Sequence, residues 1–245
     1  MEFLEKNGKL IIGAFGLLIV VGLITVFAST NSKKNEEKTQ EKLAVIELDY
    51  TKYKEEVAKS MAPASPIKDD KKSLEDKKNK VKTMADAGLN SVQLRGKLMI
   101  SLTQFIADNK KSVATEMAAL YLSEVLIDQN KNTEALEVLK KTESSSNDLT
   151  SVLVQKKIGS LLADNNQCEE ALKVWDKLLK SSSAKFAHSE VKIMQSLCYQ
   201  KMNDLKKAEE ILVSVKNDKT EGSADYAQHA ERILRLIQFK KASGT

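Results

Sequence analysis

Few side chains in this sequence can act as nucleophiles or metal ligands. The 245 residues include two histidines and two cysteines, His188, His229, Cys168 and Cys198. Four such residues would be enough to bind one zinc ion. However, no two of them stand at the close spacing found in known zinc sites. Neither histidine stands at a recognised catalytic spacing, and the common phosphate-binding, dinucleotide-binding and hydrolase motifs are missing. We therefore expect no catalytic residue, no metal and no cofactor, and predict that the protein is not an enzyme.

The two cysteines allow two interpretations. Cys198 takes the place that Val125 and Leu161 hold in the repeats described below, so it can be a small buried apolar side chain. Cys168 begins one helix of the predicted repeat, and Cys198 lies towards the end of the next, antiparallel helix, so the two should be neighbours. In an oxidising compartment a disulfide here would stabilise the fold by roughly 3 to 4 kcal/mol in the chain-entropy model.

Helical periodicity and an internal repeat dominate the chain beyond residue 83. Three similar segments align on Ala135, Ala171 and Ala208, which lie 36 and 37 residues apart, and a large apolar residue follows each alanine four positions later. The preceding helix repeats as well: Ala118, Leu122, Val125 and Leu126 correspond to Val154, Ile158, Leu161 and Leu162, and then to Val191, Gln195, Cys198 and Tyr199.

Polar residues around Asn130, Asn166 and Asn203 separate the two helices of each unit and suit short turns. A recurring helix pair with an alanine opening its second helix resembles the tetratricopeptide repeat. The resemblance implies an all-α solenoid of about three helix pairs over residues 83–220. Apolar residues at 98, 102, 105 and 106 predict a leading helix, and those at 226, 230, 233, 234 and 237 predict a capping helix in residues 221–245.

The exposed face of each unit's first helix should line the concave side of such a solenoid. This face mixes apolar and charged residues, which suits binding of peptides or proteins better than small-molecule catalysis. The predicted protein-binding residues are Met117, Leu120, Glu124, Lys156, Ser160, Asp164, Glu190, Ile193, Leu197 and Lys201.

The N-terminal region contains an apolar segment. After a short tail, residues 1–9, nineteen uncharged residues run from Leu10 to Ala28 and would make roughly 28 Å of helix, enough to span a bilayer. A signal peptide cleaved before Ser29 is the alternative, but the segment is long for one and acidic residues nearly balance the preceding lysines. We favour an uncleaved single-pass anchor. Lysines are more numerous after the span, which favours a cytoplasmic C-terminal side, although long domains can translocate despite such charge.

Residues 29–82 are charged and predict a juxtamembrane helix, a break at the prolines within 61–66, and after it a linker or a frayed helix. One apolar seam runs along the helix. It can pair with a second copy, or pack on the chain's own domain or on a membrane partner. The seam consists of Leu43, Ile46, Tyr50, Tyr53 and Val57.

The net charge of +5 is spread among interleaved lysines and carboxylates, and aromatic residues make up 5% of the chain. We therefore expect no nucleic acid as a partner.

The order of these segments resembles the YfgM-like family of ancillary SecYEG translocon subunits. The resemblance rests on "LEKNGKLIIGAFGLLIV" at the start and on "LTQFIADNKKSVATEMAALYLSEVLIDQNKNTEALEVL". It implies a bacterial inner-membrane protein with a periplasmic domain. The implied partners are the SecYEG translocon, a membrane-anchored periplasmic chaperone and secreted clients. The alternative is an oligomeric structural scaffold of another envelope or secretion complex.

Overall fold

The computed structural model describes residues 36–61, 74–109, 111–144, 146, 148–220 and 222–243. Within these ranges all regular secondary structure is helical, and no strand occurs, so the predicted all-α class is confirmed. The first described helix covers residues 36–61. It is followed by α2 (Leu74–Asp108), α3 (Val113–Ile127), α4 (Asn132–Thr142), α5 (Leu149–Asp164), α6 (Cys168–Lys180), the 3-10 helix η1 (Ser182–Ala187), α7 (His188–Lys201), α8 (Leu205–Lys216) and α9 (Ala224–Ser243).

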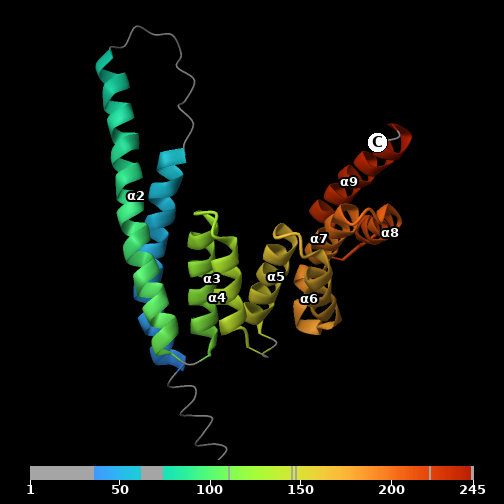
Figure 1. Cartoon of the computed structure of the whole chain (residues 1–245), viewed down its shortest axis with the longest axis horizontal. Helices are drawn as coiled ribbons and strands as arrows, with labels where there is room; N and C mark the ends of the chain where they lie inside the picture. The colour runs from blue at the N-terminus through green and yellow to red at the C-terminus, as the bar shows by residue number, and fades with distance from the viewer. Residues whose placement is uncertain are drawn as a thin grey trace, which may run out of the picture.

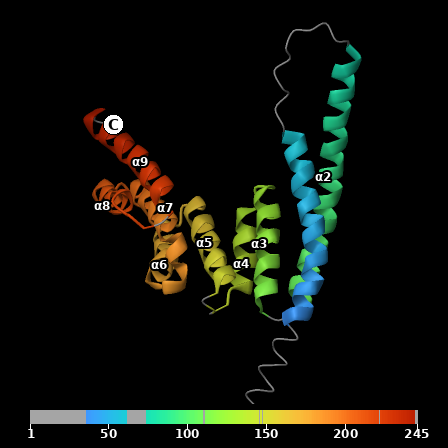
Figure 2. The same ribbon diagram turned by 180° about the vertical axis from the view of Figure 1, so that it is seen from behind.

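Three helix hairpins form the middle of the molecule: α3 with α4, α5 with α6, and α7 with α8. Figures 1 and 2 show them in a row, with the 36–61 helix and α2 at one end and α9 at the other. The aligned alanines are fully buried at 0% exposure, because each opens a second helix that lies close to its first. The predicted helix-pair repeat is therefore present in the fold, and the arrangement is compatible with an α-solenoid.

The three hairpins turn in the same way. Asn130, Asn166 and Asn203 have φ of 60°, 61° and 61°, and among the described residues they are the non-glycine residues with positive φ. Asparagine tolerates this left-handed conformation better than most residues, which explains its recurrence. In every turn the asparagine N–H donates to a carbonyl three residues earlier, and the next N–H donates to a carbonyl five residues earlier.

The middle hairpin is packed most closely. Trp175 is 1% exposed and lies against Gly159 of α5. A Cβ atom at position 159 would lie 2.2 Å from Trp175 Nε1, so only glycine lets the indole approach the α5 backbone. Trp175 can therefore occupy this position only when residue 159 is glycine.

A buried carboxylate joins the first hairpin to the second. Glu116 of α3 is 1% exposed and accepts hydrogen bonds from Ser144 N and Ser151 Oγ, both at 2.8 Å. Both of its oxygens are thus satisfied, as burial of a carboxylate requires. This contact holds the loop between α4 and α5 against the start of α3.

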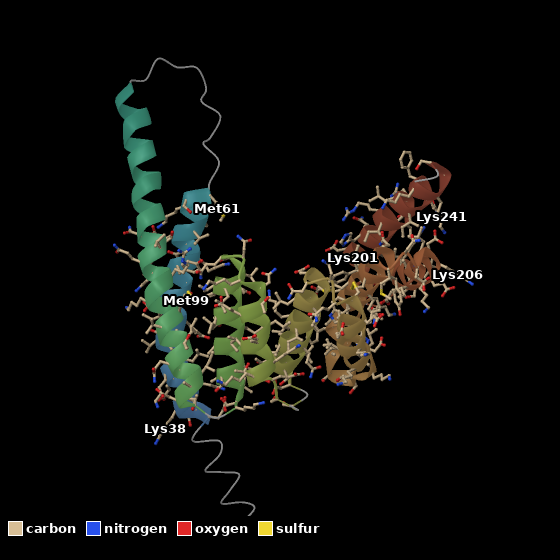
Figure 3. All side chains as sticks on the ribbon, viewed as in Figure 1. Lys38, Met61, Met99, Lys201, Lys206 and Lys241 are labelled. Atoms are coloured by element: carbon tan, nitrogen blue, oxygen red, sulfur yellow. A yellow bond between two sulfur atoms is a disulfide. The ribbon has the colours of Figure 1, made fainter. Side chains whose placement is uncertain are left out.

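The capping helix α9 packs on α7 and α8. Ala230, Ile233, Leu234 and Ile237 are buried in a second apolar cluster with residues of those helices, and Lys241 Nζ forms an ion pair with Glu209 Oε2 at 2.6 Å. Figure 3 shows Lys241 on α9 near this junction.

At the other end, α2 begins at Leu74 and continues to Asp108. The helix thus starts before residue 83, where we placed the boundary between linker and repeat domain. Its first nine residues include four lysines, one glutamate and one leucine, which are good helix formers, so their charge is compatible with a helix.

The 36–61 helix packs on the chain's own domain. It lies beside α2 in both ribbon views, and its ends are marked by Lys38 and Met61 in Figure 3. Leu43 and Tyr53 are 4% and 2% exposed, and the other three seam residues pack against the same core. Self-association through this seam, which stays a prediction, would require the helix to leave α2 and α3.

No helix in the described part of the chain is long and apolar enough to cross a membrane. The predicted anchor, residues 10–28, lies outside the described residues, as does most of the predicted break at 61–66.

Candidate protein-binding groove

A groove runs across the first helices of the three hairpins. Its main part has a volume of about 460 Å³, and an adjoining part of about 250 Å³ continues it along α7. Ser160, Asp164 and Met194 line both parts. We call the whole the repeat groove. It is lined by Met117, Leu120, Tyr121, Glu124 and Ile127 of α3, by Leu153, Lys156, Lys157, Ser160, Leu161, Ala163 and Asp164 of α5, by Trp175 of α6, and by Glu190, Met194, Leu197, Cys198 and Lys201 of α7.

Helical periodicity explains how α5 reaches this surface. Leu153, Lys157, Ser160 and Asp164 are spaced three or four residues apart and therefore share one face of the helix. The opposite face of α5 contributes Val154, Ile158 and Leu162 to the core. One helix thus holds the fold together on one side and lines the groove on the other.

Nine of the ten residues predicted from the sequence line the repeat groove. Ile193 does not, and its prediction was wrong. This side chain is 4% exposed and belongs to the apolar cluster formed with α8 and α9. Because α8 and α9 cover this face of α7, the position that is partly exposed as Lys156 in the second hairpin is buried in the third.

One repeat-equivalent set that was not predicted from the sequence also lines the groove: Tyr121, Lys157 and Met194. Each follows directly after a predicted position: Leu120, Lys156 and Ile193. A helix face of this width admits two adjacent residues per turn. Applying the repeat alignment to the next residue would have found all three.

Several charged groups in the groove are already engaged. Lys156 Nζ and Glu190 Oε2 form an ion pair at 2.8 Å between α5 and α7. Lys201 Nζ donates to the Ala163 carbonyl at 2.7 Å, at the carboxyl end of α5. Figure 3 shows Lys201 at the end of α7 near α5. These contacts tie α5 to α7.

The 36–61 helix borders the groove along α3 through tyrosine–carboxylate contacts. The Tyr50 hydroxyl donates to Glu124, and the Tyr121 hydroxyl donates to Glu47 Oε1 at 2.9 Å. The rings of Tyr50 and Tyr121 stack with centroids 4.4 Å apart. Tyr121 and Glu124 thus belong both to this interface and to the groove.

A third contact, Tyr53 Oη to Asp128 Oδ2 at 3.1 Å, follows one turn further along. Burial, together with the carboxylate at Asp128, raises the pKa of Tyr53 to about 12, and burial with the contact to Glu47 raises that of Tyr121 to about 12. Burial and the contact with Glu124 raise the pKa of Tyr50 further. All three phenols therefore remain protonated donors at neutral pH.

The structure brings the two cysteines together as a disulfide. Their sulfur atoms are 2.33 Å apart and their Cα atoms 5.3 Å apart, joining the start of α6 to the end of α7. Cys168 and Cys198 are 6% and 1% exposed. The disulfide joins α6 to α7, and Cys198 and Trp175 both line the second part of the groove. The bond therefore stabilises the helix junction that forms this part of the groove.

The histidines lie apart from the groove. His188 Nε2 is 3.2 Å from the carbonyl oxygens of Leu178 and Ser181, and His229 is exposed on α9. Among the described residues, no group of three or more His, Cys, Asp or Glu side chains is placed to hold a metal ion.

The arrangement offers an elongated, partly apolar surface with engaged charges, which suits binding of a polypeptide segment. Comparison with protein-family models, with curated proteins and with solved structures gives no match.

Proposed function

We propose that this protein is a membrane-anchored scaffold that binds other proteins in the repeat groove, at the extracytoplasmic face of the bacterial inner membrane. The observation that carries the proposal is the groove itself. The first helices of the three hairpins line one continuous groove, and its main part has a volume of about 460 Å³. Binding, without making or breaking a bond, is what such a surface provides.

The partner class in this proposal comes from the resemblance to the YfgM-like translocon subunits. In that family's arrangement, an N-terminal anchor such as Leu10 to Ala28 keeps a tetratricopeptide-like domain beside SecYEG, where secreted chains and a membrane-anchored periplasmic chaperone are available. Anchoring would raise the effective concentration of the groove for emerging segments, since tethering converts a bimolecular encounter into a local one.

The cysteine pair supports an oxidising location. A Cys168–Cys198 bond would persist in the periplasm and would be reduced in the cytoplasm. Because the pair lies at the α6–α7 junction beside the groove, its oxidation would stabilise the surface that binds the partner.

Membrane topology tests the proposal. Alkaline phosphatase fused after Thr245 of the full chain folds into an active enzyme only outside the cytoplasm, so the proposal predicts high activity in intact bacteria. A fusion that is stably expressed and inactive would place the repeats in the cytoplasm and overturn the location. A matched fusion of β-galactosidase, active only in the cytoplasm, should give the opposite result.

A further inference from the structure

Within the part of the chain that the structure describes, two charges in the repeat groove have no partner. Lys157 and Asp164 both line its main part, and neither has a hydrogen bond or an ion pair among the described residues. The neighbouring charges differ in this respect: Lys156 is paired with Glu190, and Glu124 accepts from Tyr50 and lies 3.8 Å from Lys54 Nζ. The unpaired lysine and aspartate are therefore the charges that remain for a ligand.

The two residues are seven positions apart on α5, which is two helical turns or about 10 Å along the axis. The same spacing places both on the groove face of the helix. Asp164 is also the last residue of α5, where the helix dipole adds negative potential, whereas Lys157 lies in the middle of the helix. Lys157 thus supplies a positive charge in the middle of the α5 face, and Asp164 supplies a negative one at its end, where the Lys201 ammonium is held by the Ala163 carbonyl.

Apolar side chains surround these charges. Leu153 lies one turn before Lys157 on α5, and Leu120 lines the same part of the groove. Met117 and Met194 contribute two flexible thioethers. Methionine adapts its shape to different apolar partners, so this part of the surface should tolerate varied sequences. The fixed charges are then the features that select and orient a ligand.

We propose that the groove recognises an apolar segment of a partner protein that carries one carboxylate and one cationic side chain about 10 Å apart, with the carboxylate opposite Lys157 and the cation opposite Asp164. In a helical segment the two side chains are about seven residues apart on one face. In an extended segment only an even spacing keeps both on one side, so they are about two or four residues apart. The inference rests on the proposed function, since it specifies the chemistry of the segment that the groove would bind.

The test uses the full chain in detergent micelles and three fluorescein-labelled peptides with the same apolar residues. One peptide carries Glu and Arg seven positions apart, one carries Gln at both positions, and one carries Glu at both. Fluorescence anisotropy should show the Glu/Arg peptide binding about threefold to tenfold more tightly than the Gln/Gln peptide, as expected for two partly exposed ion pairs. The difference should shrink in high salt.

Charge reversal in the protein should reverse the preference. The Asp164→Lys variant is expected to bind the Glu/Glu peptide more tightly than the Glu/Arg peptide, and Lys157→Glu should lose the advantage of the Glu/Arg peptide. Matched reversals at exposed positions outside the groove, Lys173→Glu on α6 and Glu137→Lys on α4, should leave the order of the three peptides unchanged. Circular dichroism checks that each variant keeps its helices.

A Leu153→Glu variant establishes whether a peptide occupies the groove at all. If the peptides bind in a way that depends on Leu153 but the three are bound equally, the charge-based recognition is overturned while the proposed binding function stands. If no peptide binds, this inference is likewise overturned, and the proposed function is then decided separately by the partners that the groove contacts in cells.

Discussion

The three hairpins and the N-terminal helices are held by different kinds of contact. Within the hairpins, repeated apolar positions and fully buried alanines bring paired helices together, and the same turn recurs three times. The 36–61 helix is held to α3 by three tyrosine–carboxylate hydrogen bonds and a stacked ring pair, in addition to its apolar seam. The packing of the hairpins thus follows from repeated apolar positions, whereas the position of the 36–61 helix also depends on individual polar contacts.

This difference predicts different responses to mutation. The hairpins should be sensitive to changes in volume, because close packing leaves no room for an added atom or for a cavity. The N-terminal contact should respond to loss of single hydrogen bonds and to pH.

The largest effect is expected at the closest contact between two helices. Trp175→Ala should lower the free energy of unfolding by about 3 to 5 kcal/mol through loss of a buried aromatic side chain. Gly159→Ala should cost about 1 to 3 kcal/mol, because the new Cβ meets the indole. Urea unfolding measures both. Gly96→Ala is the matched control, since a Cβ there meets nothing within 4 Å and should be neutral or stabilising.

Reduction of the disulfide comes next. The bond closes a loop with a sequence separation of 30, so its loss should lower stability by about 3 to 4 kcal/mol in the chain-entropy model. Thermal unfolding with and without reductant measures the change. A Cys168→Ser, Cys198→Ser double variant should not respond to reductant. Intact-mass analysis after thiol trapping in cells that finds two free thiols would show that the bond does not form there.

The N-terminal contact should lose stability at high pH. Tyr53 and Tyr121 have their pKa raised from 10.0 to about 12 in the folded state, so the fold favours their neutral forms. The stabilisation is therefore complete below pH 10 and is lost as the pH rises from about 10 towards 12. Tyr53→Phe should cost about 1 kcal/mol at neutral pH and weaken this pH dependence. An unchanged alkaline profile in a Tyr53→Phe, Tyr121→Phe variant would contradict the assignment.

An effect about as small as that of Tyr53→Phe is expected at the turns. Asn130, Asn166 and Asn203 occupy the left-handed region, so alanine at any one of them should cost about 1 kcal/mol, whereas glycine should be nearly neutral. Denaturant unfolding of the two substitutions at each position measures the difference. Similar losses of stability at all three sites would support equivalent turns. If the alanine variants are as stable as the glycine variants, the left-handed conformation of these residues is contradicted.

The hairpins were predictable from sequence because their signal repeats. The alignment of Ala135, Ala171 and Ala208 identified the second helices, and the intervening asparagines marked the turns that the structure shows. Ile193 was misplaced because the repeat alignment takes no account of the end of the row, where α9 covers one face of α7 and α8.

The N-terminal packing was predictable only in part. The periodicity of Leu43 to Val57 showed that one face is buried, but periodicity carries no information about what covers it. Contacts such as Tyr50 with Glu124 join residues 74 positions apart in the sequence, and nothing local marks them as partners. The unpaired charges at Lys157 and Asp164 likewise become visible only once their neighbours are seen to be paired.

Site-specific photo-cross-linking in living bacteria tests the central claim most directly. A photoreactive amino acid would replace Leu153 in the groove of the full chain, and in a matched strain Lys177 on the exposed face of α6. We expect adducts with other proteins from position 153 and few from position 177. Mass spectrometry should identify the adducts at position 153 as translocon subunits, a periplasmic chaperone or secreted chains. Equal adducts from both positions, or none from position 153, would contradict binding in the groove.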